Sequence, residues 1–302
     1  MSTYNKTSFW TWLKQQSLLV KLIILNVAVF LTLRLTWITI LLLFGEENSM
    51  AMMTLSTLWL GVPSSWLSFV RHAWTILTFQ FTHFSLWHIL SNMIVLYWMG
   101  HIFLDYFNQK QLTALYLMGG VAGGLLFTTA CSLLPSMAGS TPLIGASASV
   151  LAIIVAITVY NPDYRVCLFL IGDIALKWIT GIFILLMLLS FDGSNSGGLI
   201  AHLGGALMGL AWGLAIKRGH DLTAWPNKAI DSLVSLVKRN KPSRNNWKMP
   251  KHEYKENAAQ AESSDNKREA QLDEILKKIK QSGYGALTDE EKDILFSFSR
   301  KK

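Results

Sequence analysis

Residues 142–151 read Pro-Leu-Ile-Gly-Ala-Ser-Ala-Ser-Val-Leu, a run of small residues that opens an apolar segment and places the hydroxyl of Ser147 just inside it. Small residues in a hydrophobic helix usually allow close helix packing, and that interpretation would suffice if the run stood alone. A second run, residues 201–209, reads Ala-His-Leu-Gly-Gly-Ala-Leu-Met-Gly and carries His202 at the corresponding depth. The two runs together suggest a hydroxyl and an imidazole that meet between two closely packed helices.

The composition is that of a membrane protein with a soluble appendage. Of the 302 residues, 51% are hydrophobic and only 15% are charged, whereas about a quarter of the residues in soluble domains are charged. The net charge is +8, and most of the lysine and arginine lies after Ala215, which indicates a tail facing anionic headgroups and argues against nucleic acid as a partner. Cys131 and Cys167 fall in separate apolar segments, so no disulfide framework, metal site or cofactor is expected.

The expected fold class is an all-α polytopic membrane protein, a bundle of six transmembrane helices with a small cytoplasmic helical tail. Arg34 lies inside the first span, where snorkelling and pairing within the bundle both remain open. Residues 45–73 are too polar to span the membrane and are expected to be partly embedded at its interface. Residues 164–176 are also expected to lie along the interface. Stretches of suitable length and hydropathy predict spans at residues 18–44, 74–105, 112–134, 142–160, 177–191 and 199–216.

Charge sets the expected orientation. Lysines precede the first span and a basic cluster follows the sixth, so both termini are expected in the cytoplasm and the chain in the inner (plasma) membrane. The first span has no small-residue cleavage site behind it, which favours an uncleaved span over a signal peptide.

Five regions follow from this division of the chain. The tail contains a predicted capping box, Thr288 with Glu291, and no catalytic constellation, so it is expected to bind or orient a cytoplasmic partner. The regions are a cytoplasmic or interfacial N-terminus (1–17), the six-span core (18–217), a basic amphipathic juxtamembrane helix (218–240), a polar linker (241–266) and a C-terminal helical hairpin (267–302).

The polar residues of the second, fourth and sixth spans converge at one depth, because all three spans run in the same direction. Ser147 and His202 meet the needs of a nucleophile and a general base, since a serine hydroxyl reacts only when an adjacent base takes its proton. Gly145 beside the serine, and Gly205 and Gly209 on the face of His202, allow the helices to approach closely. Neither segment carries an orienting carboxylate, so a two-residue dyad is expected.

Further donors lie on the second span. His88 and Asn92 are four residues apart and therefore share one helix face, where they are suited to stabilise the oxyanion of an acyl-transfer intermediate. The backbone amide of Ser147, near a helix N-terminus, adds a third donor. The alternative is that His88 and Asn92 only join helices through hydrogen bonds.

These motifs resemble those of the rhomboid family. Gly145-Ala146-Ser147-Ala148 is similar to its Gly-x-Ser-x motif, residues 201–205 to its Ala-His-x-x-Gly motif, and residues 83–92 to its His…His-x-x-x-Asn signature. The resemblance covers about residues 18–217, and the tail looks like the C-terminal helical module of some bacterial members. It implies an intramembrane serine protease with Ser147 as nucleophile, His202 as base, His88 and Asn92 at the oxyanion and His83 as a supporting residue.

Two positions depart from the family pattern. Ala148 stands where glycine is usual, which is a mild change because both residues are small. Leu151 stands where an aromatic ring commonly stacks on the catalytic histidine, so one means of holding the imidazole is missing.

Proteolysis of transmembrane helices that unwind near the cut is the leading functional hypothesis. Residues 45–73 and 192–198 would be its mobile gate and lid. The alternative is a catalytically weak or inactive rhomboid-like protein that binds membrane clients. A transporter or channel is disfavoured, because the polar residues cluster at one end of the spans instead of lining a path.

Overall fold

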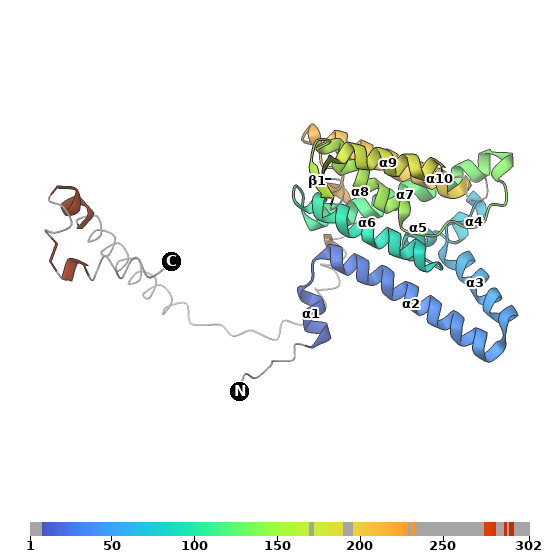
Figure 1. Ribbon diagram of the computed structural model, residues 1–302. Coiled ribbons are helices and arrows are strands. Elements are labelled where there is room, and N and C mark those ends of the chain that lie inside the picture. The colour runs from blue at the N-terminus through green and yellow to red at the C-terminus, as the bar shows by residue number, and fades with distance from the viewer. Residues whose placement is uncertain are drawn as a thin grey trace. The chain divides into compact units, whose positions relative to one another are not determined.

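The computed structural model describes residues 8–168, 172–189, 196–228, 231–232, 275–281, 287–288 and 290–292. The chain divides into two compact units, Met1–Lys238 and Arg239–Lys302. The described part of the first unit is a helical bundle with one short strand hairpin (Figure 1).

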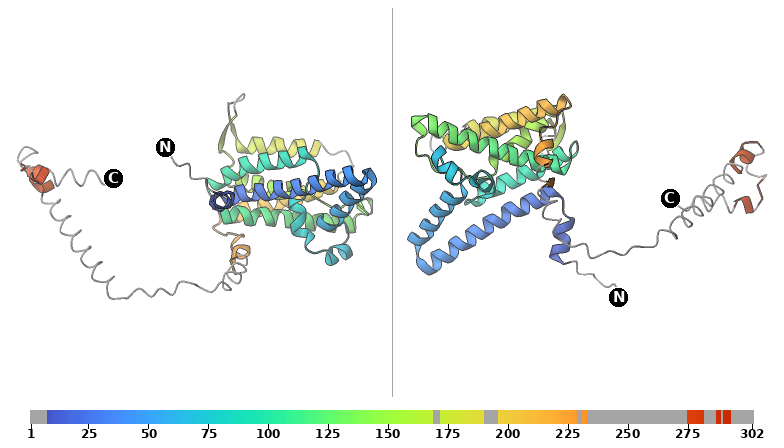
Figure 2. Two further views of the ribbon diagram at one scale, coloured as in Figure 1. Left: turned by 90° about the horizontal axis from the view of Figure 1, so that it is seen from below. Right: turned by 180° about the vertical axis from the view of Figure 1, so that it is seen from behind.

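The first predicted span coincides with helix α2. Helix α1 (Phe9–Gln15) precedes it, and α2 (Leu18–Phe44) begins after Ser17, whose hydroxyl accepts a hydrogen bond from the amide of Val20 (3.2 Å). Toward its C-terminal end α2 diverges from the bundle, and α3 (Glu46–Leu60) leads the chain back (Figures 1 and 2). Arg34 is exposed on α2, and its guanidinium carbon lies 4.3 Å from the ring centroid of Trp37. A cation–π contact therefore supports this charge within the apolar helix.

The segment after α2 presents apolar side chains outward. It consists of α3 and α4 (Trp66–Arg71), which are joined by a short irregular stretch. A segment partly embedded at a membrane interface would need such a surface, and the interfacial location of residues 45–73 stays a prediction. The exposed side chains include Met50, Leu55, Leu58, Trp59, Trp66, Leu67 and Val70.

The predicted second span begins later than expected. The span predicted over residues 74–105 is not one helix: α5 (Thr75–Thr78) and the 3₁₀ turn η1 (Phe79–Phe81) are followed by an irregular stretch, and α6 runs over Leu86–Leu104. The break has a tertiary cause. The carbonyl of Phe79 accepts hydrogen bonds both from the amide of Thr82 in its own turn (3.1 Å) and from the amide of Gly145 (2.8 Å), so this part of the backbone is also tied to a distant segment.

The fourth predicted span also begins later than expected, and its helix forms the centre of the bundle. After α7 (Gln109–Leu133) and the turn η2 (Pro135–Met137) the chain stays irregular, and α8 (Ser147–Tyr160) starts at the serine. Before it, Val62 and Leu143 form an isolated antiparallel bridge. The helix ends before residues 161–163, as their Asn-Pro-Asp sequence predicts. Helix α8 packs against α6, α7 and α10.

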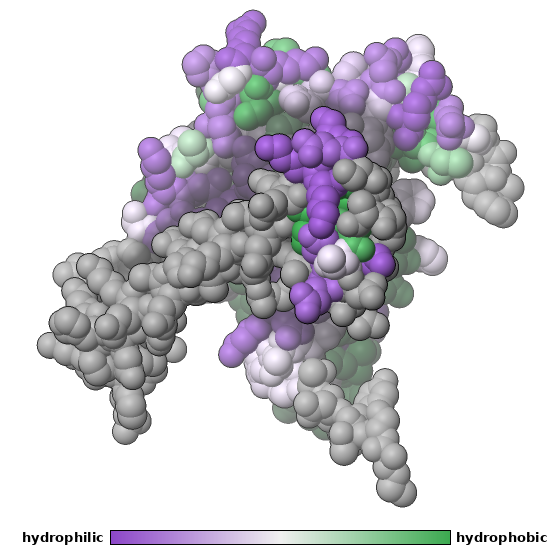
Figure 3. Space-filling view, turned by 90° about the vertical axis from the view of Figure 1, so that its left-hand side faces the viewer, coloured by the Kyte–Doolittle hydropathy of each residue, from purple (hydrophilic) through white to green (hydrophobic). Residues whose placement is uncertain are grey.

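The described part of the segment expected at the interface, residues 164–176, contains two paired strands. Strand β1 (Arg165–Leu168) pairs antiparallel with β2 (Gly172–Ala175), and α9 (Leu176–Leu189) and α10 (Ser196–Lys217) complete the bundle. Figure 3 looks onto the end of the bundle that carries α1 and β1, and hydrophilic residues gather there. Residues 192–195 of the predicted lid lie outside the described residues, while its remainder is the start of α10.

Three helices in the described part of the chain are long and apolar enough to cross a membrane: α2, α7 and residues Gly197–Lys217 of α10. Helices α8 and α9 have 14 residues each, which cover about 21 Å at 1.5 Å per residue, less than the roughly 30 Å of a hydrocarbon core. Of the irregular backbone directly before α8, Gly145 and Ala146 are buried, whereas Gly139 and Thr141 are exposed. The count of six spans therefore stays a prediction.

The tail is described only in parts. Residues 224–228 and 231–232 of the expected juxtamembrane helix are helical. In the second unit residues 275–281 are helical, and the predicted capping box is confirmed, since Glu291 N donates to Thr288 Oγ1 (3.3 Å) and Thr288 N donates to Glu291 Oε2 (2.8 Å). The predicted linker, residues 241–266, and much of the hairpin lie outside the described residues.

Candidate active site

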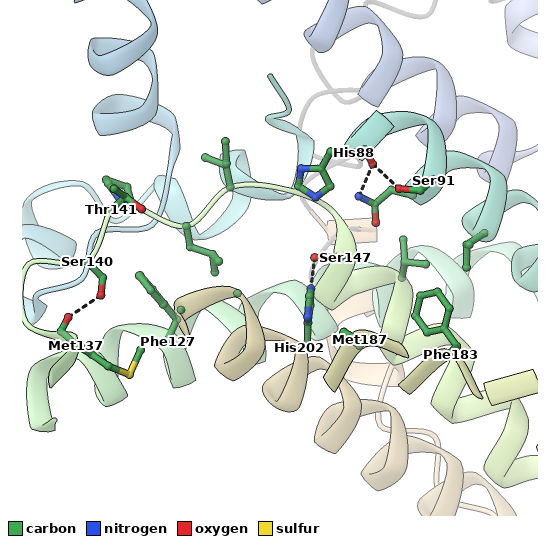
Figure 4. Close-up of a pocket in the computed structure, with 18 of the residues that line it drawn as sticks. His88, Ser91, Phe127, Met137, Ser140, Thr141, Ser147, Phe183, Met187 and His202 are labelled. Carbon is green, nitrogen blue, oxygen red and sulfur yellow. Dashed lines mark hydrogen bonds between the residues drawn. The ribbon is translucent and has the colours of Figure 1, made fainter. Parts of the chain in front are cut away.

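Ser147 and His202 are joined by a short hydrogen bond. The Oγ of Ser147, at the first position of α8, lies 2.6 Å from the Nε2 of His202 on α10. Figure 4 shows the two side chains pointing toward one another from the two helices. This separation lets a histidine take the proton of a serine hydroxyl as the oxygen attacks a carbonyl.

Glycines bring the two helices together at this point. A Cβ on Gly205 would overlap the backbone of Ala148, and a Cβ on Gly209 would overlap the backbone of Ala152. Both predicted packing glycines thus lie where α10 crosses the backbone of α8. The contact of these helices fixes the distance between the hydroxyl and the imidazole.

The turn before Ser147 requires glycine. Gly145 has φ +113°, a backbone conformation that L side chains rarely adopt. A Cβ there would also lie 2.6 Å from Cε1 of His88. Gly145 therefore allows the sharp entry into α8 and lets the His88 ring pack against that entry.

His88 and Asn92 both line the cavity of Ser147, as their shared helix face predicted. The side-chain amide of Asn92 donates to the carbonyl of His88 (2.8 Å), so in this structure one of its two N–H groups is engaged within α6. His83 lies behind the cavity, where its Nε2 accepts a hydrogen bond from the amide of Ala146 (3.2 Å). The structure thus gathers all three residues around the start of α8.

The far side of the His202 ring is unsupported. Its Nδ1 is buried without a hydrogen-bond partner in the described part of the chain, so no carboxylate orients it there. Leu151, one turn beyond Ser147, is buried and lines with His202 a second, apolar cavity of about 260 Å³. Leu151, which lines this cavity, stands at the position where the family pattern was expected to have an aromatic ring.

The main cavity has a volume of about 730 Å³ and reaches from α6 and α9 to the segment before α8. On one side lie apolar residues, among them Val95, Phe183 and Met187. On the other side lie Ser140 and Thr141 together with Phe127 and Met137 (Figure 4). The cavity therefore has an apolar flank and a mixed polar and apolar flank, with Ser147 and His202 between them.

No metal site accompanies these histidines in the described residues. The rings of His83 and His88 lie edge to face with centroids 5.0 Å apart, but no third His, Cys, Asp or Glu of the described residues completes a set of ligands.

One polar residue near the site was missed by sequence reasoning. Gln80 is fully buried, and its Oε1 accepts a hydrogen bond from the hydroxyl of Ser149 (2.9 Å), two residues beyond Ser147. The available signal was a single amide in the apolar run Thr75–Phe81. Its partner is distant in the sequence, so the pattern alone did not reveal it.

Comparison with known proteins covers both units. The family described as Rhomboid domain matches residues 70–219, and a family of unknown function (DUF6576) matches residues 260–301. The chain is 31% identical over 155 residues to the mouse "Presenilin-associated rhomboid-like protein, mitochondrial" (49% of this chain, 38% of the relative). The human protein of that name is 30% identical over 157 residues, with the same shares. RHOMBOID-like protein 12, mitochondrial, of Arabidopsis thaliana is 32% identical over 161 residues (48% of this chain, 47% of the relative). The chain spans less than half the length of these curated relatives.

Proposed function

We propose that this chain, which belongs to the rhomboid family and is a membrane protein, is an intramembrane serine endopeptidase. In this proposal Ser147 is the nucleophile and His202 is the general base. The observation that carries the proposal is the 2.6 Å hydrogen bond between the two side chains inside the main cavity. A hydrogen bond that served only to hold the two helices together would not need a cavity beside it.

The reaction follows from this geometry. Ser147 Oγ attacks the scissile carbonyl while Nε2 of His202 takes the hydroxyl proton. The same imidazolium then gives this proton to the leaving amine, and an acyl-enzyme remains on Oγ. Water attacks the ester with His202 again as base, which releases the new carboxylate and restores the serine.

Three groups are available for the oxyanion of the tetrahedral intermediate. The backbone N–H of Ser147 stands at the first position of α8, where helices leave their amides without intrahelical partners. The ring of His88 lies beside Gly145, and the amide of Asn92 lines the same cavity. Donors held in place before the reaction are worth most in a site that excludes bulk water.

The substrates we infer are transmembrane helices that unwind easily and carry a small residue at the cut. A helical carbonyl is hidden in its own hydrogen bond until the helix opens. The apolar flank of the cavity, with Phe183 and Met187 of α9, suits the membrane-embedded part of such a segment. The lipid bilayer and a cytoplasmic partner of the tail complete the expected contacts.

A plasma-membrane location with both termini cytoplasmic is part of the proposal. It is supported by the lysines before α2 and the basic residues after α10. The matched relatives are mitochondrial by name, so fractionation of cells that express a tagged chain tests the location. Recovery with mitochondrial membranes would contradict it.

A fluorophosphonate probe tests the mechanism on the full chain. The wild type should be labelled and should cleave a transmembrane test substrate, while Ser147→Ala and His202→Ala should do neither and should still insert in membranes. Ser132→Ala removes an exposed hydroxyl at the C-terminal end of α7 and serves as the matched control. Labelling of this variant should be unchanged.

The alternative function is binding of membrane clients without cleavage. Leu151 in place of a stacked ring is the observation that favours it, because His202 then has less support. A wild-type chain that co-purifies with a transmembrane client but is neither labelled nor active would support this alternative.

A further inference from the structure

Residues 79–83 hold the start of α8 at three points. Two of the hydrogen bonds go to the backbone before Ser147 and one goes to a side chain just after it, so the serine lies between them. The three bonds are Gly145 N to Phe79 O (2.8 Å), Ala146 N to His83 Nε2 (3.2 Å) and Ser149 Oγ to Gln80 Oε1 (2.9 Å).

The last of these bonds comes from a firmly held amide. Besides accepting from Ser149, the side chain of Gln80 donates through Nε2 to the carbonyls of Ile76 (2.9 Å) and Leu117 (3.5 Å). The backbone carbonyl of Gln80 accepts from the hydroxyl of Tyr116 on α7 (3.0 Å). Gln80 therefore has bonds to the preceding helix α5, to α7 and to α8, and its side chain has little freedom to move.

The core is shaped around this amide. A Cβ on Gly120 of α7 would overlap the carboxamide of Gln80, so the glycine leaves the space that the amide fills. Gln80 and Ser149 are both fully buried. A buried amide costs free energy unless its hydrogen bonds are satisfied, whereas replacing both partners of a buried hydrogen bond by apolar groups of the same shape can be nearly neutral for stability. Stability alone therefore gives little reason for an amide at this position.

We propose that Gln80 is a positioning residue: through the hydroxyl of Ser149 it fixes the first turn of α8 and thereby the place of Ser147 Oγ relative to His202 Nε2. This inference rests on the proposed function. Neither Gln80 nor Ser149 lines the main cavity, so they act on the geometry of the nucleophile and not on substrate binding.

Ser149→Ala and Gln80→Met test the inference in the full chain. Each removes one side of the hydrogen bond and nearly preserves volume. We expect the rate of fluorophosphonate labelling and kcat for a transmembrane test substrate to fall roughly tenfold, with KM unchanged, because small displacements of a nucleophile are costly. The double variant should be no slower than Gln80→Met alone, because both changes break the same contact.

Thr158→Val is the matched control. It removes a hydroxyl from the same helix, where Thr158 contacts Thr180 at 2.6 Å, near the opposite end from Ser147. This substitution should at most lower the melting temperature. The folded variant should be labelled at the same rate as the wild type.

The outcomes separate the two proposals. If the wild type is labelled and cleaves but Ser149→Ala and Gln80→Met do so at the wild-type rate, the positioning role is overturned and the proposed function stands. A lower melting temperature with an unchanged labelling rate overturns it equally, since that is what a purely structural contact would give. If the wild type is not labelled at Ser147, both the proposed function and the positioning role of Gln80 are overturned.

Discussion

Gly205 on α10 lies directly against the backbone carbonyl of Ala148 on α8, with no space for a Cβ between them. Ala148 follows the nucleophile in the chain, and Gly205 lies one turn from His202. A close approach of the two helices is thus built into the turns that carry Ser147 and His202. Packing and chemistry depend on the same contact.

Gly205→Ala should therefore separate the catalytic pair. We expect labelling of Ser147 to fall at least roughly tenfold, because the added methyl group forces α10 away from α8 and lengthens the hydrogen bond of 2.6 Å. Gly181→Ala is the matched control: a Cβ there meets nothing within 4 Å, so activity should be retained. Equal labelling of both variants would contradict the packing argument.

Much of this site follows from local sequence. Two motifs place Ser147 and His202 among small residues, and a shared helix face places His88 and Asn92 together; the structure brings all four to one cavity. The family expected from these motifs is confirmed. The ends of α2 were also predictable, because an apolar run with a serine before it and a glycine after it fixes a helix locally.

Other features depend on contacts that no local pattern encodes. Residues 75–85 lie within a predicted span, yet the helix is broken there, and the carbonyl of Phe79 bonds to the amide of Gly145 in the turn before α8. The delayed start of α8 involves the same contact. The bond between Gln80 and Ser149 joins residues 69 apart in the chain, and only the folded arrangement shows it.

Gly145→Ala tests the entry into α8. The φ of +113° is strained for alanine, and the new methyl group would meet the His88 ring. We expect a loss of about 1–3 kcal/mol of stability and labelling below one tenth of the wild-type rate. Thermal unfolding and labelling on the same preparation measure both effects.

Gly139→Ala is the comparison for Gly145→Ala. Gly139 also has positive φ (+76°) but nothing within 4 Å of its Cβ position. Because Gly139 itself lines the main cavity, the comparison uses thermal unfolding, where Gly139→Ala gives the cost of backbone strain without the clash with His88. If both variants lost stability to the same extent, the His88 contact would have no role.

Leu151→Phe tests the unsupported side of His202. The larger ring would extend into the apolar cavity of about 260 Å³ that Leu151 and His202 share. Because a ring beside the imidazole restricts its motion, we expect the labelling rate to rise by roughly twofold to fivefold. Leu151→Ala should enlarge the cavity and lower the rate. A fall in rate with Leu151→Phe at unchanged stability would show that the cavity has to stay open.

Asp221 joins three segments at the opposite end of the bundle. Its carboxylate accepts hydrogen bonds from Nε1 of Trp212 (3.2 Å), from Nε2 of Gln111 (2.9 Å) and from the amide of Thr223 (2.8 Å). Burial alone would raise the pKa of Asp221, but hydrogen bonds from Thr223, Gln111 and Trp212 outweigh it and hold the pKa below its ordinary 3.8. The ionised form is therefore the one that stabilises the fold.

Asp221→Asn should lower the free energy of unfolding by roughly 1–2 kcal/mol at neutral pH, because the amide keeps one acceptor and turns a donor toward Gln111. A folded-state pKa below the unfolded one means that this contribution is complete above pH 3.8 and is lost as the pH falls through the folded-state value. Thermal unfolding across that range should thus show the gap between wild type and variant closing in acid. Asp231→Asn is the control, since its ion pair with Lys110 (2.7 Å) is exposed and should contribute little. A gap that persists in acid, or an equal cost for Asp231→Asn, would contradict the role of the Asp221 carboxylate.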